Sequence, residues 1–301
     1  MDFAGKNAIV TGGSSGIGKA TAKLLAAEGA NVFIIARNRE RLDQALAEIE
    51  TRRARPDQQL KASSADVTDY EAIESAITAI VERQGGPDIL VNSAGIARPG
   101  YFQELPVGEF HEHMDINYLG TLHAAKACVP LMMAQGSGHI VNVSSVAGVI
   151  GVFGYTAYGA SKFAVLGLSE VMRIELKPHN IAVSVVIPND TDTPQLRAER
   201  ELQPLETKIT EGIVKPKELT RPSEFLAYWL IRLINGGEPL EADQVAKAVI
   251  KGIRQGRYLI VPDPLFGVAY RLRGLVVPLA NWAFDRLVPV ARRQLADEEG
   301  S

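Results

Sequence analysis

The chain has 301 residues, 46% of them hydrophobic, and a formal net charge of -3. This length and composition can bury a full core and predict one large α/β domain with an appendage. The charge balance and the lack of a concentrated Lys/Arg face argue against nucleic acid as a partner.

The single cysteine and the N-terminus bear on the compartment. Cys128 has no second cysteine with which to form an intrachain disulfide or a cysteine-based zinc site, and no metal site is predicted. Residues 1–10 lack the cationic and then apolar segment of an export signal and run directly into a strand pattern. We therefore expect a cytoplasmic catalytic domain.

Short β-branched runs alternate with helical patterns over the first 187 residues. The runs are continuously apolar, as expected for strands buried on both faces of a parallel sheet. They lie at residues 7–10, 32–35, 89–91, 139–143 and 182–187, and the helical patterns lie at residues 16–28, 39–51, 69–84, 107–133 and 158–177. This order predicts an α/β fold with a Rossmann-type, doubly wound parallel sheet.

The regular alternation stops after Pro188. Residues 189–241 contain helix-like patches such as 222–234 but no clear strand, and we expect them to form an insertion that covers the substrate. A helix at residues 243–254 should lead to a last strand at 258–261. The prediction is a dinucleotide-binding and catalytic domain over residues 1–263, followed by a helical tail over residues 264–301.

A glycine-rich segment follows the first strand and opens the first helix. Glycine lets the backbone turn sharply and approach a pyrophosphate, which the N–H groups and dipole of the helix N-terminus then stabilise. The spacing leaves three residues between Gly12 and Gly16, unlike the G-x-G-x-x-G fingerprint, and a simple tight turn is the alternative. The predicted contacts are Gly12, Ser14, Ser15, Gly16, Ile17 and Gly18.

The end of the second strand bears on the choice of cofactor. NAD-binding proteins of this fold carry an acidic residue there for the ribose 2′-hydroxyl, but this chain has Ala36 followed by Arg37. A guanidinium can pair with a 2′-phosphate, which favours NADPH/NADP+; alternatively, Arg37 only solvates a helix start. Asp66 and Val67, after the third strand, could hold the adenine, although Asp66 is equally suited to capping a helix.

Tyr158 and Lys162 stand four residues apart on a predicted helix, so their side chains share one face. An ammonium about 4 Å from the phenol would lower its pKa by roughly three units from a reference of about 10, before solvation losses. The phenol could then exchange a proton with a carbonyl oxygen while a nicotinamide supplies hydride. Lys162 is also expected to bind the nicotinamide ribose. Either Ser144 or Ser145, after the strand ending at Val143, could polarise the same oxygen.

These motifs together resemble the short-chain dehydrogenase/reductase family over about residues 5–193. The residues that carry the resemblance are Thr11, Gly16 to Gly18, Asn92 to Gly95, Asn117, Ser144 and Ser145, and Tyr158 to Lys162. It implies that Tyr158 is the acid/base, that Lys162 assists it, that Ser145 binds the substrate oxygen and that Asn117, at a local kink, completes a proton relay. Asn92, Ala94 and Gly95 would shape the nucleotide crevice. The resemblance also implies a homo-oligomer, a dimer or tetramer.

The stretch after the sixth strand departs from the family pattern. Pro188 is followed by Asn189 where the family has glycine, so either Thr191 or Thr193 could hold the nicotinamide carboxamide. The string from Asp190 to Pro194 is, however, similar to that of the 3-ketodihydrosphingosine reductases, as are Ala36 to Asn38 and the arginine-containing apolar tail. This resemblance implies reduction of a long-chain keto-lipid, 3-dehydrosphinganine, to sphinganine.

The tail over residues 264–295 admits several interpretations. Its longest uncharged stretch, residues 274–284, has eleven residues, which is shorter than the ~20 needed to span a bilayer. There are three alternatives for this tail. It could contact the cytoplasmic face of a membrane peripherally, pack on the rest of the chain, or form an oligomer contact. The membrane contact would lie beside arginines 271, 273, 286, 292 and 293. Phe102, Phe153, Tyr155 and apolar residues of 196–234 could line a lipid groove.

Two other functions compete with the sphingoid reductase. One is reduction of another lipophilic ketone, such as a 3-oxoacyl thioester or a steroid. The other, of a different class, is a non-catalytic NADP(H)-binding scaffold or sensor. The combination of Ser145, Tyr158 and Lys162 argues against the scaffold, since a pure binder has no use for an activated phenol.

Overall fold

A seven-stranded parallel sheet forms the centre of the computed structural model, which describes residues 2–204, 219–235 and 238–299. The strand order is β3-β2-β1-β4-β5-β6-β9, so neighbouring β1 and β4 mark the point where the order reverses. A crevice at the carboxyl ends of the strands forms at such a point. The bounds are β1 Asn7–Thr11, β2 Asn31–Ala36, β3 Leu60–Ser64, β4 Ile89–Asn92, β5 Gly138–Val143, β6 Ile181–Val186 and β9 Leu259–Ile260.

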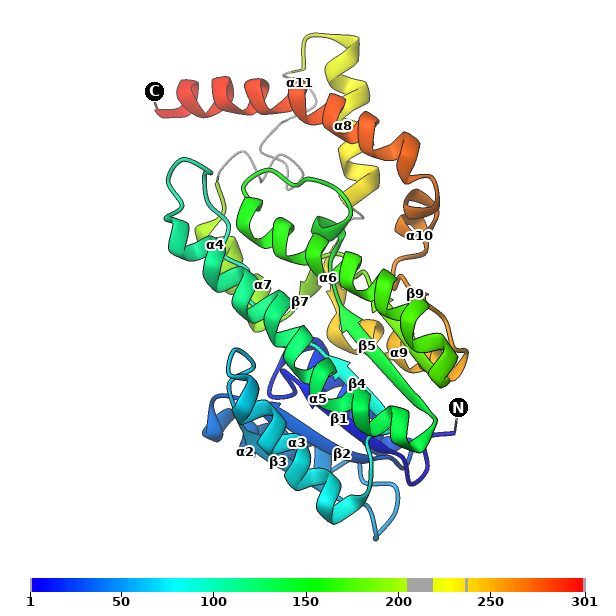
Figure 1. The fold of residues 1–301 in the computed structure, drawn as a ribbon. Helices are drawn as coiled ribbons and strands as arrows, with labels where there is room; N and C mark the ends of the chain where they lie inside the picture. Colours follow the sequence, from blue (N-terminus) through cyan, green and yellow to red (C-terminus); the bar gives the residue numbers. More distant parts are fainter. Residues whose placement is uncertain (1, 205–218, 236–237, 300–301) are drawn as a thin grey trace.

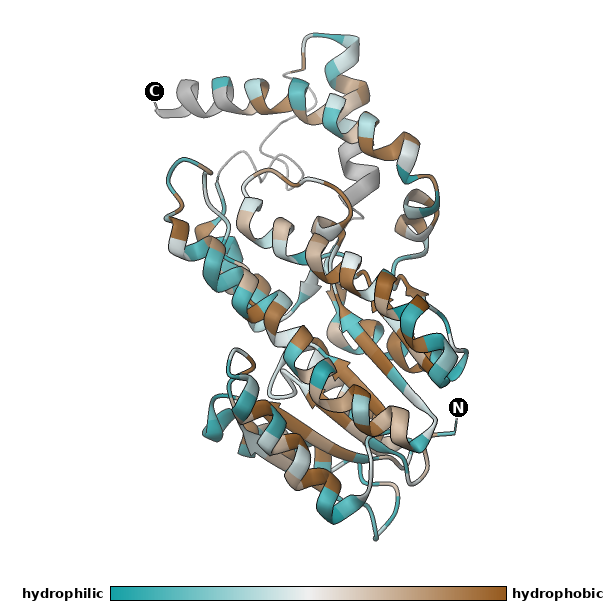
Figure 2. Ribbon diagram, viewed as in Figure 1, coloured by the Kyte–Doolittle hydropathy of each residue, from teal (hydrophilic) through white to brown (hydrophobic). Residues whose placement is uncertain are grey.

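Helices cover both faces of the sheet, which confirms the doubly wound prediction (Figure 1). On one face lie α1 (Gly16–Ala27), α2 (Arg39–Glu50) and α9 (Ala242–Arg254), and on the other lie α3 (Tyr70–Gln84), α5 (Gly120–Gln135) and α6 (Thr156–Leu176). Figure 2 shows the hydrophobic strands enclosed between helices with hydrophilic outer faces. The apolar strand runs are buried on both sides, which is why they lacked alternation.

The expected single helix over residues 107–133 is divided into three parts. They are α4 (Val107–His113), the π-helical segment η1 (Met114–Leu119) and α5, so the region is helical as expected, with a π-segment at Asn117 where a local kink was expected. The Thr121 hydroxyl donates to the Asn117 carbonyl at 2.7 Å. A π-segment is a frequent deformation at functional sites.

The insertion begins and ends in one short parallel strand pair. β7 (Thr191–Asp192) pairs with β8 (Leu240–Glu241), which corrects the expectation that residues 189–241 contain no strand. Two residues are too few to give a periodic signal. Between them lie α7 (Pro194–Leu202) and α8 (Pro222–Asn235). Residues 205–218 and 236–237, which include part of the expected lipid groove, lie outside the described residues.

The tail forms two helices that pack on the same chain. α10 (Pro264–Arg271) leads into α11 (Arg273–Glu299), and α11 crosses α8 beyond the end of the sheet (Figure 1). Ala227 and Tyr228 of α8 share a buried apolar cluster with Ala283, Leu287 and Val290 of α11. We call α8, α10 and α11 the helical cap. Within the described ranges, no helix is both long and apolar enough to cross a membrane.

Candidate active site

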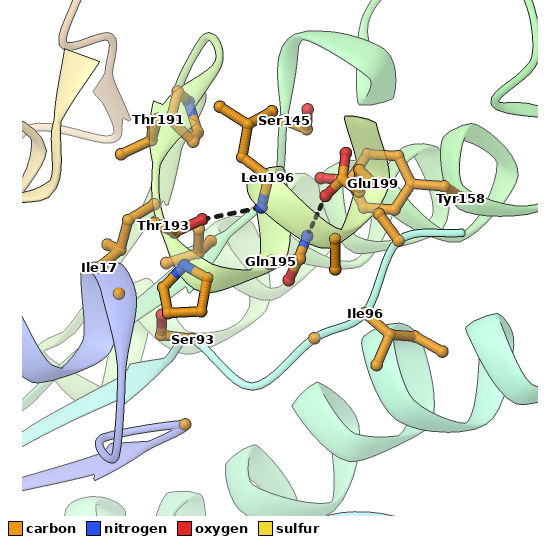
Figure 3. Close-up of a pocket in the computed structure, with 18 of the residues that line it drawn as sticks. Ile17, Ser93, Ile96, Ser145, Tyr158, Thr191, Thr193, Gln195, Leu196 and Glu199 are labelled. Carbon is orange, nitrogen blue, oxygen red and sulfur yellow. Dashed lines mark hydrogen bonds between the residues drawn. The ribbon is translucent and has the colours of Figure 1, made fainter. Parts of the chain in front are cut away.

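A cavity of about 960 Å³ opens at the carboxyl ends of the strands. We call the part lined by residues 12, 14–17, 36–38, 41 and 65–67 its nucleotide end, and the part lined by Ser145, Tyr155, Tyr158, Lys162 and Glu199 its catalytic end. Figure 3 shows α7 carrying Leu196 and Glu199 along this cavity, with Ile17 on one side and Tyr158 on the other. Phe284 of the helical cap also lines it.

The glycine-rich turn at the nucleotide end leaves no room for side chains. A Cβ on Gly12 would lie 2.6 Å from the Ala94 nitrogen, and one on Gly18 would lie 2.4 Å from the Gly12 carbonyl oxygen. Gly16 has a φ of +51°, in the left-handed region. The N-cap Ser15 makes no side-chain cap bond, which leaves the first N–H groups of α1 directed to an incoming anion. These features fit the pyrophosphate of a dinucleotide.

Charged side chains gather where the second and third strands end. Arg37 and Arg41 both line the cavity, and Asn38 accepts a hydrogen bond from the Arg41 N–H at 2.8 Å. Arg37 is exposed and lies 3.7 Å from Asp66, which also accepts two bonds from Thr68. Asp66 therefore serves as a cap as well as a wall of the cavity, together with Val67. Asn38 and Arg41 were not predicted as contacts, although Arg41 stands one helical turn after Arg37.

Asn92 lies in the interior, is 2% exposed and is not among the residues that line the cavity, so its contact with a cofactor stays a prediction. Its Nδ2 donates to Asn142 Oδ1 at 2.9 Å inside the sheet. The strand β4 ends at Asn92 and only the following loop reaches the cavity, through Ser93, Ala94 and Gly95. Gly18 likewise lies behind the loop against Gly12.

Tyr158, Ser145 and Lys162 converge at the catalytic end as expected. Tyr158 and Lys162 lie one turn apart on α6, and Ser145 stands at the end of β5, where it also accepts the Ala147 N–H at 3.2 Å. Lys162 Nζ donates to the Val143 carbonyl at 3.0 Å and lies 5.7 Å from the centre of the Tyr158 ring. The hydroxyl of Ser144 instead donates to the Lys162 carbonyl, so Ser144 has a structural place.

The electrostatics of Tyr158 differ from the expectation. Burial raises its pKa above the usual value, the negative charges of Glu199 and Asp190 act in the same direction, and the hydrogen bond with Ser145 lowers it. In the free protein, burial and the nearby carboxylates therefore outweigh the lowering of the phenol pKa that was expected from Lys162. Burial also lowers the pKa of Lys162, to about 8. A phenol that keeps its proton is the form that can donate to a carbonyl oxygen.

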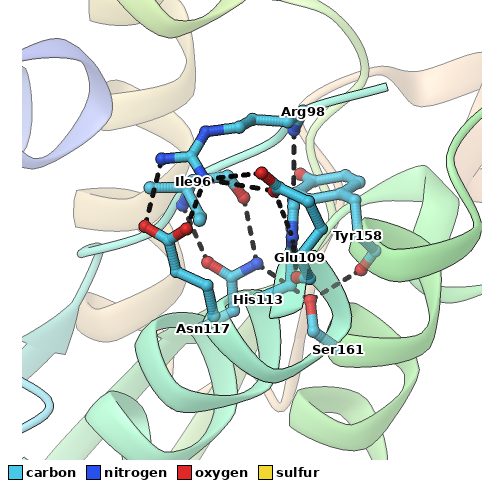
Figure 4. Close-up of polar contacts among 8 residues, drawn as sticks. Ile96, Arg98, Glu109, His113, Asn117, Tyr158 and Ser161 are labelled. Atoms are coloured by element: carbon cyan, nitrogen blue, oxygen red, sulfur yellow. Dashed lines mark hydrogen bonds and ion pairs between the residues drawn. The ribbon is translucent and has the colours of Figure 1, made fainter. Parts of the chain in front are cut away.

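Asn117 fixes the floor of the site and does not line the cavity. Its Oδ1 accepts the Ile96 N–H at 2.8 Å, while its Nδ2 donates to the Ile96 carbonyl and to Ser161 Oγ (Figure 4). Ser161 in turn donates to the Tyr158 carbonyl at 2.7 Å. A Cβ on Gly95 would lie 2.9 Å from Asn117 Oδ1 and 3.3 Å from Lys162 Nζ. The structure thus brings Asn117 close to the catalytic helix, and its relay role stays a prediction.

A polar cluster behind Tyr158 was not predicted. His113 is fully buried, its Nε2 accepts the Arg98 N–H at 3.1 Å, and its Nδ1 is 2.6 Å from the Glu109 carbonyl, which defines a neutral tautomer (Figure 4). Burial lowers its pKa. Its ring meets that of Tyr158 edge-on at 6.5 Å, and the Arg98 guanidinium pairs with Glu109 and Glu112. Only tertiary contact reveals this support.

The segment after Pro188 crosses from one end of the cavity to the other. Pro188, Thr191 and Thr193 all line it, as expected. Thr191 donates to the Asn189 carbonyl at 2.9 Å, whereas Thr193 caps α7 by accepting the Leu196 N–H at 3.2 Å. A Cβ on Gly16 would lie 3.1 Å from the Thr193 methyl group, so α7 starts against the glycine-rich turn.

The catalytic end contains aromatic residues that were expected there and one acidic residue that was missed. Phe153 and Tyr155 line the cavity as the expected lipid groove requires, but Phe102 is 69% exposed and does not. Glu199 is 7% exposed and faces the same space from α7. Nothing in the sequence signalled its burial, because Glu199 stands among the charged residues Arg197, Arg200 and Glu201.

Comparison with known proteins agrees with this geometry. A model of short chain dehydrogenases matches residues 6–204. A 3-ketodihydrosphingosine reductase of Mus musculus is 43% identical over 72% of this chain and 67% of its own length, and one of Dictyostelium discoideum is 38% identical over 96% and 84%.

Among solved structures, a short chain dehydrogenase/reductase of Burkholderia phymatum in complex with NAD has the same fold. It superposes with a TM-score of 0.74 at 24% identity and covers 93% of this chain and 96% of that protein. The matched family model, the relatives and the arrangement of Ser145, Tyr158 and Lys162 lead to one conclusion. The chain belongs to the short-chain dehydrogenase family of oxidoreductases.

Proposed function

We propose that the protein reduces the 3-keto group of 3-dehydrosphinganine to sphinganine with NADPH. The observation that carries the proposal is the similarity to a 3-ketodihydrosphingosine reductase over 96% of the chain, which includes the insertion and the helical cap. The helical cap and the part of the insertion after α7 lie beyond the family model, which ends at residue 204. Of these parts, Phe284 of the cap lines the cavity together with Glu238 and Pro239.

In this mechanism the bound nicotinamide supplies hydride to the carbonyl carbon. Tyr158 donates its phenolic proton to the carbonyl oxygen, and Ser145 hydrogen-bonds the same oxygen. Burial and nearby carboxylates keep Tyr158 protonated, which suits the reductive direction. Lys162 fixes α6 to the end of β5 through the Val143 carbonyl, and Asn117 links α6 to the loop after β4 through Ser161 and Ile96.

NADPH is proposed as the cofactor because of the charges at the nucleotide end. Ala36 stands where a carboxylate would repel a 2′-phosphate, and Arg37 and Arg41 line the adjoining wall. Guanidinium groups bind phosphate through paired, charge-assisted hydrogen bonds. Asp66 is already paired with Arg37, so the arginine is oriented along the cavity wall in the absence of cofactor.

The catalytic end also offers an apolar path for a long alkyl chain. Phe153, Leu196, Leu202 and Phe284 line it and come from the loop before α6, from α7 and from α11. The path leads towards the helical cap, since Phe284 lies one turn before the buried Leu287. A long-chain substrate could therefore extend from Tyr158 to the cap.

We also propose peripheral contact of the helical cap with the cytoplasmic face of a phospholipid membrane. Apolar side chains of all three cap helices and of the turn between α10 and α11 are exposed, namely Phe225, Leu226, Trp229, Leu265, Val268, Leu272, Leu275 and Leu279. Exposed apolar residues beside arginines 271 and 273 suit an anionic interface.

Sedimentation with vesicles of phosphatidylcholine and phosphatidylserine tests the membrane contact. Replacing Trp229 and Leu275 together by serine should reduce the bound fraction several-fold, whereas Val107→Ser, an exposed site on α4, should not. Equal sedimentation of both variants would contradict the contact.

We further propose a homo-oligomer, which light scattering of the purified protein tests.

The decisive experiment for the reaction is NADPH oxidation with 3-dehydrosphinganine, with sphinganine identified by mass spectrometry. We expect turnover of this ketone to exceed that of short 3-oxoacyl thioesters and of steroid ketones. Equal or faster turnover of the thioesters would contradict the sphingoid assignment. Cofactor binding without turnover of any ketone would instead support the scaffold alternative.

A further inference from the structure

Glu199 is a carboxylate buried beside the catalytic tyrosine. It projects from the same face of α7 as the buried Leu196, while Arg197 and Arg200 on the other faces are exposed. Helical periodicity would place an apolar residue at this position. Burying a carboxylate is costly unless it is paired, so its retention at a cavity wall calls for a reason.

Neutral groups hold the Glu199 carboxylate in place. Gln195 Nε2 donates to Oε1 at 2.8 Å, and the Tyr155 hydroxyl donates to Oε2 at 3.2 Å (Figure 3 shows the first bond). Gln203 Nε2 donates to the Tyr155 hydroxyl at 2.6 Å, which orients that donor. Among the described residues, the direct partners of this carboxylate are therefore uncharged, and its orientation is fixed before any ligand arrives.

The charges around Glu199 leave the catalytic end acidic. Asp190 adds a second negative charge, and the Lys162 ammonium is bound to the Val143 carbonyl on the opposite wall. Burial raises the pKa of Glu199 to about 7, with Asp190 adding to the effect and with Gln195, Tyr155 and Lys162 opposing it. Four arginines line the cavity: Arg37 and Arg41 lie at the nucleotide end, Arg98 is paired with glutamates, and Arg200, on an exposed face of α7, lies near Asp192. None of these four is among the groups that shift the pKa of Glu199. A cation would be favourable here.

We propose that Glu199 binds a primary ammonium group on the carbon next to the reacting ketone and so selects amino ketones over uncharged ketones. The inference rests on the proposed function, because the 3-keto-lipid carries its amine at C2, directly beside the carbonyl. With the carbonyl oxygen at Tyr158 and Ser145, the C2 substituent lies within reach of α7. A 3-oxoacyl thioester has a methylene at this position and leaves the carboxylate without a counter-charge.

The test compares two ketones of equal chain length, one with the C2 amine and one without it. For the wild type we expect a kcat/KM ratio that favours the amine at least tenfold. Glu199→Gln, which removes the charge but keeps the size of the side chain and one acceptor oxygen, should lower this ratio at least tenfold, mainly through KM. Glu201→Gln, on the exposed side of α7, should keep the wild-type ratio. A ratio unchanged in Glu199→Gln would overturn the proposal.

Inhibition by dodecylamine and by dodecanol separates this inference from the proposed function. Each is tested against whichever ketone the wild type reduces. Dodecylamine should inhibit the wild type at least fivefold more strongly than dodecanol, and Glu199→Gln should remove that difference. If the wild type reduces only uncharged ketones, the proposed function is wrong, but the inhibition measurements still test whether Glu199 binds an amine. Equal inhibition of the wild type and of Glu199→Gln by dodecylamine would overturn the proposed amine site. Matching melting temperatures of the two proteins establish that the variant is folded.

Discussion

The two ends of the cavity are built in different ways. The nucleotide end consists of turns that directly follow β1, β2 and β3, and much of its surface is backbone around Gly12 and Gly16. The catalytic end combines side chains of β5, α6, α7 and α11 that lie up to 139 positions apart, from Ser145 to Phe284. A cofactor common to many enzymes can be held by local turns, whereas a selective ketone site needs distant elements.

The two ends also differ in charge. Arg37 and Arg41 stand at the nucleotide end, while Glu199 and Asp190 stand at the catalytic end. An anionic dinucleotide and a cationic substrate would therefore occupy separate electrostatic regions of one cavity. If the ends are independent, a substitution at one should leave the function of the other unchanged.

The largest expected effect is the loss of chemistry with an intact nucleotide end. Tyr158→Phe removes the proton donor, and general acid catalysis contributes roughly 10²- to 10⁴-fold to the rate. We expect kcat to fall by about 10³-fold, while NADPH affinity measured by fluorescence changes less than twofold. Tyr70→Phe, on the exposed side of α3, is the matched control. Retained turnover in Tyr158→Phe would contradict the assignment of the acid.

A destabilised helical cap should damage only the catalytic end. Leu287 is fully buried between α11 and α8, so Leu287→Ala should lower the free energy of unfolding by about 2–5 kcal/mol. KM for a long-chain ketone should rise, because Phe284 lines the cavity one turn away. Leu275→Ala, at a side chain 68% exposed, should change stability by less than about 0.5 kcal/mol. Urea unfolding measures the free energy of unfolding, and steady-state kinetics measure KM. An equal loss of unfolding free energy in the two variants would argue against a packed cap.

The converse substitution should alter only the nucleotide end. Arg37→Asp replaces a phosphate partner with a repelling carboxylate, and a charge-assisted bond worth about 1.5–3 kcal/mol corresponds to a ratio of roughly 10 to 100. We expect the NADPH/NADH preference in kcat/KM to fall by that factor, with the ratio between amino and uncharged ketones unchanged. Arg39→Asp, outside the cavity, is the control. An unchanged cofactor preference would mean that Arg37 only solvates the start of α2.

The smallest expected effect is a pH dependence confined to the catalytic end. The pKa of Glu199 is raised to about 7, so the carboxylate becomes protonated as the pH falls through 7 and loses its attraction for an ammonium. KM for the amino ketone should therefore rise below pH 7, by at most about tenfold per pH unit, whereas KM for NADPH should stay flat. Tyr155, Tyr158, Lys162 and Asp190 face the same group. Glu199→Gln should abolish this rise of KM below pH 7. A rise that persists in the variant would be due to one of those neighbouring groups.

The sequence was most informative where the structure is local. The strand and helix order, the glycine-rich turn and the pairing of Tyr158 with Lys162 depend on neighbours within a few residues, so pattern and spacing could predict them. Packing added features that the sequence did not predict. Asn92 bonds to Asn142 inside the sheet, the helical region over residues 107–133 contains a π-segment, and a two-residue strand pair closes the insertion.

The sequence by itself determined the fold class, the glycine-rich turn and the grouping of the candidate catalytic residues, because each has a periodic or contiguous signature. The tertiary structure alone decided which charges surround that set. It brought Glu199 of a seemingly exposed helix beside Tyr158, packed His113 behind the same ring, and joined α11 to α8 above the cavity. Burial and the approach of distant elements set the protonation state of a phenol, and neither is encoded in the spacing of residues along the chain.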